Sequence, residues 1–338
     1  MNFPEFQKYI IHASGQSWKK IALFNPLTIR QKGTKAKAIF ALALVCFFWG
    51  TTWVASKAGV TYMPALQLAG IRQLLGGLCF IIFFLYKGAP WPKGKEWRTI
   101  LILSFLNFLL SNALSTWGVR YIPAGLAAII GAIFPLWIVL IGLFTAGGGI
   151  PSKAIIGLVV GFAGVCIIFY EPLHSGNFSH PGFLKGILLS LVATWSWAFG
   201  TLYTKKHAAN FNPYFSLGLQ MIISSIALLS ITQTTSIGIP FTAIPWQAWA
   251  AIGYLIVFSS IITFISYLYA LQRLPTVQVS IYAYVNPIVA VLLGATVLGE
   301  KLTLFIAVGG IVALLGVYLV NRTFKSIPPP EQPEPEGV

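Results

Sequence analysis

The segment Tyr121-Ile-Pro-Ala-Gly-Leu-Ala-Ala-Ile-Ile-Gly-Ala-Ile-Phe-Pro135 recurs 152 residues later as Arg273-Leu-Pro-Thr-Val-Gln-Val-Ser-Ile-Tyr-Ala-Tyr-Val-Asn-Pro287. In each copy a first proline opens an apolar segment and a second follows twelve residues on, about 18 Å along a helix that rises about 1.5 Å per residue. The second proline donates no hydrogen bond and displaces the carbonyl four residues back, that of Gly131 or Ala283. These prolines are predicted to interrupt two helices at matching depths, and paired interruptions of this kind point to the binding site of a transporter.

The composition is that of an integral membrane protein. Of 338 residues, 57% are hydrophobic and 9% are charged, with a mean hydropathy of +0.81, whereas a soluble domain has about 25% charged residues. Apolar runs of about 18 to 22 residues recur, long enough for a helix to cross a hydrocarbon core of about 30 Å. The sequence therefore predicts an all-α integral membrane protein with ten transmembrane helices, at residues 38–58, 64–86, 98–118, 122–144, 152–170, 182–204, 213–232, 247–271, 275–298 and 302–321.

The ten predicted helices form two repeats of five. Residues 38–170 make up the first repeat and residues 182–321 the second, with corresponding residues 148 to 152 positions apart, as for Trp49 and Trp197. Because each repeat has an odd number of spans, the second must cross the membrane upside down relative to the first. We therefore expect an inverted repeat around a central cavity that opens alternately to either side.

The positive charge, a net +15, sets the expected orientation. With the amino terminus inside, 17 of the 22 Lys and Arg residues fall on the cytoplasmic side and 4 on the outer side, and such an excess marks the cytoplasmic face. We expect a multi-pass protein of the inner (cell) membrane with both termini in the cytoplasm. The basic tail, residues 1–37, either lies on anionic lipid or is disordered, and the Pro/Glu-rich tail, residues 322–338, is disordered by composition. No basic face with stacking residues is present, so no nucleic-acid partner is expected.

Cysteine and histidine form no catalytic or metal-binding pattern. Cys46, Cys79 and Cys166 lie in three separate apolar runs, without the spacing of a metal site or a disulfide framework. The four histidines fall in predicted tails or loops, and no carboxylate joins them within a span. The sequence therefore predicts no catalytic residue, no metal and no cofactor.

Polar and aromatic side chains inside the predicted spans are the candidates for binding a small-molecule substrate. Arg72 is the only charge well inside a span; its guanidinium suits a carboxylate or phosphate, and a structural contact with backbone carbonyls is the alternative. Lys57 either adds charge to the cavity or extends to the membrane interface. The predicted substrate-binding residues are Trp49, Trp53, Arg72, Asn107, Ser111, Trp197, Thr201, Gln220, Thr263, Tyr267, Tyr282 and Asn286, and the predicted helix breaks are Pro135 and Pro287.

Small residues form a face suited to close helix packing. They are spaced as GxxxGxxG in the fifth predicted span and recur in the tenth. Missing side chains let two backbones approach closely, either between these spans of one chain or across a homodimer, so the protein is expected to be a monomer or a homodimer. The residues are Gly157, Gly161 and Gly164, echoed by Gly309, Ala313 and Gly316.

Three motifs resemble those of the drug/metabolite transporter superfamily, and within it the EamA family, over residues 38–321. They are Phe48-Trp49-Gly50-Thr51-Thr52-Trp53-Val54-Ala55-Ser56-Lys57, Gly70-Ile71-Arg72-Gln73-Leu74-Leu75 and Leu298-Gly299-Glu300-Lys301-Leu302-Thr303. The first half departs from the family pattern at Gly147-Gly148-Gly149-Ile150, where the family usually has an acidic turn like that at Glu300. The resemblance implies secondary transport or export of small metabolites, amino acids among them.

The function expected from these features is secondary transport by alternating access. The sequence has no Asp, and its seven Glu residues lie in tails, loops or span ends, so a buried carboxylate proton relay has no member. We therefore expect an exporter, a facilitator or an exchanger rather than a proton-driven carrier, unless the fold brings Glu300, His174 or His180 inward. Two alternatives are a membrane sensor or scaffold without transport, which would lack a solvated cavity, and a membrane-embedded enzyme acting on lipid-linked substrates, for which no catalytic cluster is evident.

Overall fold

The computed structural model describes residues 34–145, 152–174, 182–207, 212–274, 282–300 and 302–325. Over these ranges the chain is helical and contains no β-strand, as predicted. The predicted tails lie outside them, except that the first helix already begins at Thr34 and the last continues to Lys325. The glycine turn at 147–150 and the start of the ninth predicted span, residues 275–281, also lie outside the described residues.

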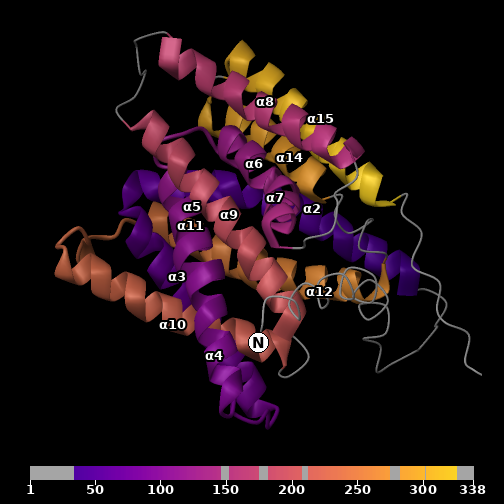
Figure 1. Ribbon diagram of the computed structural model, residues 1–338. Coiled ribbons are helices and arrows are strands. Elements are labelled where there is room, and N and C mark those ends of the chain that lie inside the picture. Colours follow the sequence, from indigo (N-terminus) through magenta and orange to yellow (C-terminus); the bar gives the residue numbers. More distant parts are fainter. Residues whose placement is uncertain are drawn as a thin grey trace, which may run out of the picture.

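The helices follow one another with short connections (Figure 1). The first half of the chain contains α2 (Thr34–Tyr62), α3 (Ala65–Tyr86), α4 (Lys95–Leu103), η1 (Ser104–Asn112), α5 (Ala113–Gly118), α6 (Ala124–Ala132), α7 (Phe134–Thr145) and α8 (Ser152–His174). The second half contains α9 (Phe183–His207), α10 (Pro213–Thr234), η3 (Phe241–Ala243), α11 (Trp246–Tyr254), η4 (Leu255–Ile262), α12 (Thr263–Arg273), α14 (Tyr282–Leu298) and α15 (Leu304–Lys325).

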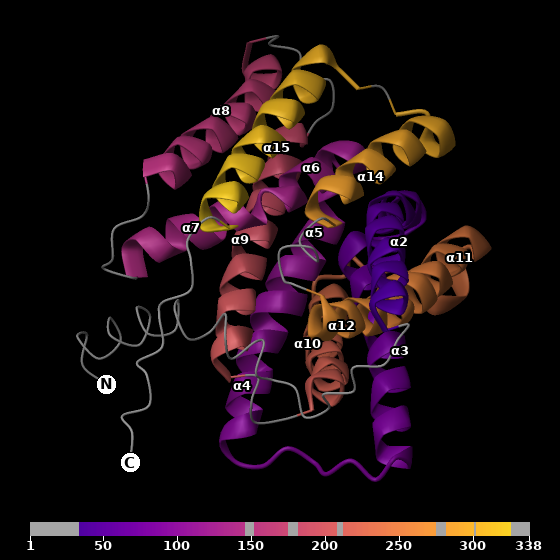
Figure 2. The same cartoon turned by 90° about the vertical axis from the view of Figure 1, so that its right-hand side faces the viewer.

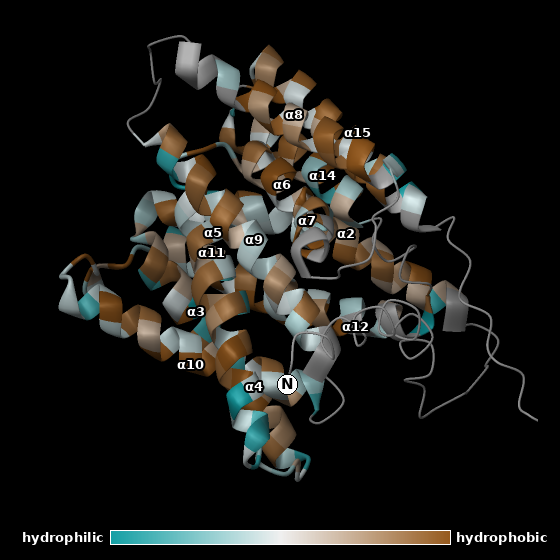
Figure 3. Cartoon of the chain, viewed as in Figure 1, coloured by the Kyte–Doolittle hydropathy of each residue, from teal (hydrophilic) through white to brown (hydrophobic). Residues whose placement is uncertain are grey.

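Six of these helical stretches are long and apolar enough to cross a membrane. They carry large apolar side chains on their outer surfaces, such as Ile82 and Ile226, 63% and 60% exposed, and Figure 3 shows apolar residues along most helices. Four further apolar helices are shorter. The count of ten spans and their inverted insertion remain predictions. The long stretches are Ala36–Tyr62, Ala65–Tyr86, Lys95–Gly118, Phe183–Thr204, Pro213–Thr234 and Trp246–Tyr267, and the shorter ones are Ala124–Ile138, Ile155–Ile168, Tyr282–Leu298 and Leu304–Val320.

Local sequence signals place some of the helix ends. The amide oxygen of Asn212 accepts hydrogen bonds from the backbone N–H groups of Tyr214 (3.0 Å) and Phe215 (3.2 Å), and Pro213 occupies the first helical position of α10. Both features satisfy or remove free amide donors at a helix start. At the end of α3, Gly88 adopts a φ of 69°, a conformation that glycine takes without strain.

Corresponding helices from the two halves pack side by side, α3 against α10 and α8 against α15 (Figures 1 and 2). The α8–α15 pair is the closer one. A Cβ atom added at Gly164 would meet the backbone of Gly309 and Ala313, and one added at Gly316 would meet the backbone of Gly161. The predicted small-residue face therefore lies between two helices of one chain.

The two interrupting prolines behave differently. In the first half the helix stops at Ala132 and restarts at Phe134, directly before Pro135, with Ile133 as the break. In the second half the prediction of a break at Pro287 is wrong, because α14 runs through that residue as one helix. A proline removes one backbone hydrogen bond, and a membrane helix tolerates this when its neighbours satisfy the freed groups.

Two segments of π-helix lie at corresponding places in the two halves. They are η1, which continues α4 into α5, and η4, which continues α11 into α12; they begin 151 residues apart, at Ser104 and Leu255. A π-helix has one residue more per hydrogen-bonded turn than an α-helix and is frequent at functional sites. Apolar periodicity alone did not predict these segments.

Candidate binding cavity

A cavity of about 180 Å³ lies between helices of both halves. The first half contributes residues of α2, α3, η1, α5, α6 and α7, and the second contributes residues of α9, η4, α12 and α14. Eight of the twelve predicted binding residues line it. They are Trp49, Trp53, Arg72, Asn107, Ser111, Trp197, Tyr282 and Asn286.

Four predicted binding residues do not line the cavity. Gln220 is buried and donates to the hydroxyl of Ser216 (2.8 Å), and Thr263 is buried and donates to the carbonyl of Phe258. Tyr267 packs behind Trp49, with ring centroids 5.1 Å apart, and Thr201 lies further along α9 than the lining residues. On α9 helical periodicity gave the right face, because Thr194 and Trp197 line the cavity, but it could not give the depth at which the cavity ends. The helix of Gln220, α10, contributes no lining residue among those described.

Residues outside the predicted set also line the cavity. On α2 the lining residues are Trp49, Thr52, Trp53 and Ser56, and this spacing of three and four puts them on one helical face. Because Thr52 and Ser56 lie on the same helical face as the two tryptophans, the sequence could have predicted that they line the cavity. The remaining polar and aromatic additions are Asn112, Ser115, Thr116, Phe134, Thr194, Ser259 and Phe264.

Arg72 is the one charged residue among the described residues of the cavity wall, and it is only 3% exposed. Its Nε atom is buried without a hydrogen-bond partner. The alternative role predicted for Arg72, a contact with backbone carbonyls, is not among the hydrogen bonds of the described residues. The neighbouring Gln73 instead fastens α3 to η1, since its Nε2 donates to Phe108 O (3.3 Å) and Asn112 Oδ1 (3.1 Å).

Aromatic rings form one wall of the cavity. Trp49 contacts Tyr282 (ring centroids 5.0 Å apart) and Phe264 (5.5 Å), and Phe134 lies parallel to Tyr282 at 6.3 Å. Trp53 packs over Gly131, where an added Cβ would come within 2.7 Å of the indole. These rings offer an apolar surface with polar edges, which is typical of small-molecule sites.

The two residues whose carbonyls the prolines are predicted to displace lie at the same cavity. Gly131 and Ala283, the residues four positions before the two prolines, are both among its lining residues. The side-chain nitrogen of Asn286 donates hydrogen bonds to Cys46 O (2.8 Å) and Tyr282 O (3.1 Å). The orientation of this amide is assigned from these two hydrogen bonds. This contact joins α14 to α2 next to the aromatic wall.

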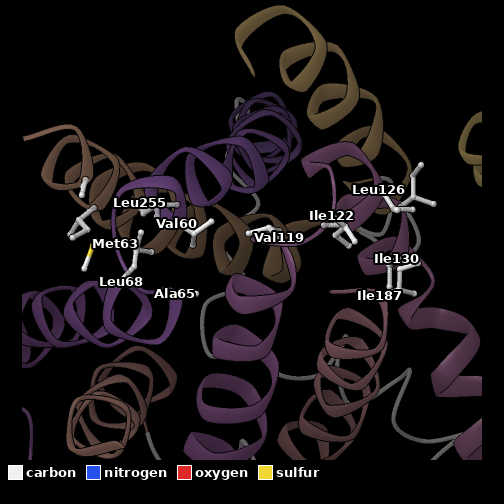
Figure 4. Close-up of a cluster of buried hydrophobic side chains, with 14 of the residues drawn as sticks. Val60, Met63, Ala65, Leu68, Val119, Ile122, Leu126, Ile130, Ile187 and Leu255 are labelled. Carbon is white, nitrogen blue, oxygen red and sulfur yellow. The ribbon is translucent and has the colours of Figure 1, made fainter. Parts of the chain in front are cut away.

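A cluster of buried apolar side chains (Figure 4) adjoins the cavity, because its residue Val119 and the partly buried Trp53 that packs against it both line the cavity. The cluster combines the end of α2 with residues of α3, α6, α8, α9, α11, η4 and α15. We call it the apolar seal. Its members include Val60, Met63, Leu68, Val119, Ile122, Leu126, Ile130, Ile187 and Leu255.

Polar contacts fasten the chain around the apolar seal. The carboxylate of Glu300, which follows α14, accepts hydrogen bonds from the backbone N–H of Ala124, at 2.8 and 2.9 Å. Ala124 is the first residue of α6, so this negative charge sits at a helix N-terminus, where it is favoured. Lys57 does not line the cavity; its side chain is half-buried, and its Nζ donates to the carbonyls of Ile122 (3.0 Å) and Arg120 (3.2 Å).

No group of three or more His, Cys, Asp or Glu side chains that could hold a metal ion occurs in the part of the chain that the structure describes. The cavity instead offers hydroxyl and amide groups, indole and phenol rings, backbone carbonyls and one guanidinium. This set of groups can bind a small organic molecule through hydrogen bonds, apolar contact and one positive charge.

Comparison with known proteins places the chain among membrane transporters. The EamA-like transporter family matches residues 36–170 and 184–322. The chain is 31% identical to the uncharacterized transporter YvbV of Bacillus subtilis, over 86% of this chain and 94% of that protein. It is 30% identical to the uncharacterized inner membrane transporter YedA of Escherichia coli K12, over 83% and 91%. One solved crystal structure shares the fold, with a TM-score of 0.57 and 15% identity over 87% of this chain and 99% of that chain. The chain belongs to the EamA-like transporter family.

Proposed function

We propose that the protein is a secondary transporter that moves small organic metabolites by alternating access through the central cavity. The observation that carries the proposal is the cavity itself, since helices of both halves enclose it and supply hydroxyl, amide and aromatic groups together with Arg72. Amino acids are the example of a substrate that the family resemblance implies. In this proposal the two halves are inverted repeats in an inner membrane, with both termini in the cytoplasm.

In this proposal the binding residues are the eight predicted residues on the cavity wall, together with the lining residues Thr52, Ser56, Asn112 and Ser259. The apolar seal closes one end, and Glu300 and Lys57 hold the surrounding chain in place. Transport requires this end to open while the opposite end closes. The contacts of Glu300 with Ala124 and of Lys57 with Ile122 each depend on one side chain, so they can be broken and formed again in such a movement.

A cysteine at position 52 tests for a solvated cavity. In a background without Cys46, Cys79 and Cys166, Thr52→Cys is expected to react with a charged thiol reagent in proteoliposomes, because Thr52 lines the cavity. Ser225→Cys is the matched control, since Ser225 is fully buried and lies outside the cavity lining. It is expected to react at least tenfold more slowly. Equal protection of both cysteines from either side of the membrane would favour a scaffold or sensor with a dry centre.

Facilitated diffusion or exchange is the expected mode of transport. No Asp occurs in the sequence, and no Glu of the described ranges lines the cavity, so the described wall has no carboxylate to carry a coupled proton. Proteoliposomes given a proton gradient, with equal solute concentrations on both sides, should therefore show no net uptake. A solute gradient without a proton gradient should drive it. Accumulation driven by the proton gradient alone would contradict this mode.

A further inference from the structure

The charge balance of the cavity identifies a class of solute. We propose, on the basis of the proposed transport function, that the solute is a small organic monocarboxylate whose carboxylate pairs with Arg72 in the cavity. Arg72 lines the cavity although the residue is only 3% exposed, and its Nε has no hydrogen-bond partner among the described residues. A planar guanidinium can donate two parallel hydrogen bonds to a carboxylate, which an ammonium cannot do.

Among the described residues, Arg72 differs from the half-buried Lys57 and the exposed Arg120 in having a buried Nε atom without a hydrogen-bond partner. The Nη1 of Arg120 donates to Val60 O at 2.9 Å, and Lys57 donates to two carbonyls, whereas the Nε of Arg72 has no partner. Burying an Arg in a membrane helix is costly unless the side chain faces a cavity or a partner. A buried Arg whose Nε has no hydrogen-bond partner among the described residues is suited to an acceptor that arrives from outside.

The second half does not balance this charge. The residue matched to Arg72 by the repeat is Gln220, which is neutral and already bonded to Ser216. No carboxylate lines the cavity in the part of the chain that the structure describes, so the described wall carries a single positive charge. A monoanion makes the loaded cavity neutral. A cation adds a second positive charge, and a zwitterion brings an ammonium that also has to be desolvated without a carboxylate partner.

The remaining lining groups fit the rest of such a solute. The rings of Trp49, Trp53 and Tyr282 offer an apolar surface for its carbon skeleton, and the cavity volume of about 180 Å³ limits it to a small molecule. The carbonyls of Gly131 and Ala283 can accept hydrogen bonds from neutral donors such as a hydroxyl group or a bridging water. They carry only partial negative charge and do not replace a carboxylate.

Four compounds with one phenyl ring test the proposal: 3-phenylpropanoate (anion), 3-phenylpropanamide (neutral), phenylalanine (zwitterion) and 2-phenylethylamine (cation). The purified full-length protein is titrated with each by calorimetry. We expect the anion to bind with a Kd at least tenfold below those of the other three. Arg72→Gln should weaken anion binding at least tenfold without affecting the amide, and Arg72→Lys should recover part of it. Arg98→Gln is the matched control, because Arg98 is exposed on α4, and it should bind the anion as the unchanged protein does.

A second measurement does not depend on the folding of the Arg72 variants. With Arg72 intact, 3-phenylpropanoate should slow the labelling of Thr52→Cys at least tenfold at a concentration at which the amide has little effect. If Thr52→Cys is labelled but the anion protects no better than the amide or phenylalanine, the monocarboxylate proposal is overturned while the transport proposal stands. If Thr52→Cys is not labelled at all, the transport proposal fails, and this inference fails with it.

Discussion

Gly164→Ala is expected to lower the free energy of unfolding by about 1 to 3 kcal/mol, as overpacking of a well-packed contact does. A Cβ at this position would fall 2.6 Å from Gly309 O and 2.7 Å from the Cα of Ala313. Backbone atoms cannot move aside as the end of a flexible side chain can, so α8 and α15 must separate to admit the methyl group. The contact is long and involves corresponding helices of both halves, so its loss should be felt by the whole fold.

The measurement is the midpoint of thermal unfolding of the detergent-solubilised protein. Gly253→Ala makes the same chemical change in α11, at an exposed position where an added Cβ meets nothing within 4 Å. It should leave stability unchanged or raise it by up to about 1 kcal/mol, because alanine is the better helix former. Equal midpoints for the two variants would show that α8 and α15 do not touch along this face.

The second large effect is expected at the apolar seal. Glu300→Ala removes the carboxylate that accepts from the N–H of Ala124, and a hydrogen bond to a charged group contributes about 1.5 to 3 kcal/mol. If this hydrogen bond exists only while the apolar seal is closed, its loss raises the fraction of molecules with an open seal about 10- to 100-fold. The reason is that about 1.4 kcal/mol corresponds to a tenfold change in an equilibrium constant. Lys57 also attracts this carboxylate electrostatically, which adds to the effect.

The rate at which a cysteine at position 56 is labelled measures the opening of the apolar seal. Ser56 lines the cavity, so Ser56→Cys should react with a thiol reagent about 10- to 100-fold faster in the Glu300→Ala background when the reagent is added on the side where α6 begins. The matched control is Glu96→Ala. The Glu96 carboxylate also accepts a backbone hydrogen bond, from Lys93 N–H at 2.6 Å, but it lies near the start of α4, away from the seal. Unchanged labelling in Glu300→Ala, or equal acceleration in both variants, would contradict a role for Glu300 in closure.

Much of the architecture could be predicted from composition and repetition. Long apolar runs indicated the membrane helices, and the spacing of Gly157, Gly161 and Gly164 indicated a close helix contact that the structure places against α15. Arg72 and Trp49 are predicted to line the cavity because a charge or an amphipathic ring is costly to expose to lipid, and both do line it. Such predictions depend only on properties of single residues or single helices.

Other features depend on neighbours and were not predicted. Tyr267 belongs to the same aromatic group as Trp49 but lies behind it, and only the packing of α12 against α2 decides which ring faces the cavity. The sequence predicts a helix break at both Pro135 and Pro287. The first half has a break next to Pro135, at Ile133, but α14 continues through Pro287 as one helix. The contact of Glu300 with Ala124 joins residues 176 positions apart, which no local pattern reveals.

The paired π-helices have a mechanical consequence. Each of η1 and η4 contains one extra residue relative to an α-helical turn, and one residue of an α-helix corresponds to a rotation of about 100°. If the π-helical turn shifted along the helix or converted to an α-helical turn, the side chains in the affected part would rotate about the helix axis by that angle. For η1 these include Asn107 and Ser111, which now face the cavity. A small winding step in two matched helices could thus exchange polar for apolar groups on the wall without any helix leaving its place in the bundle.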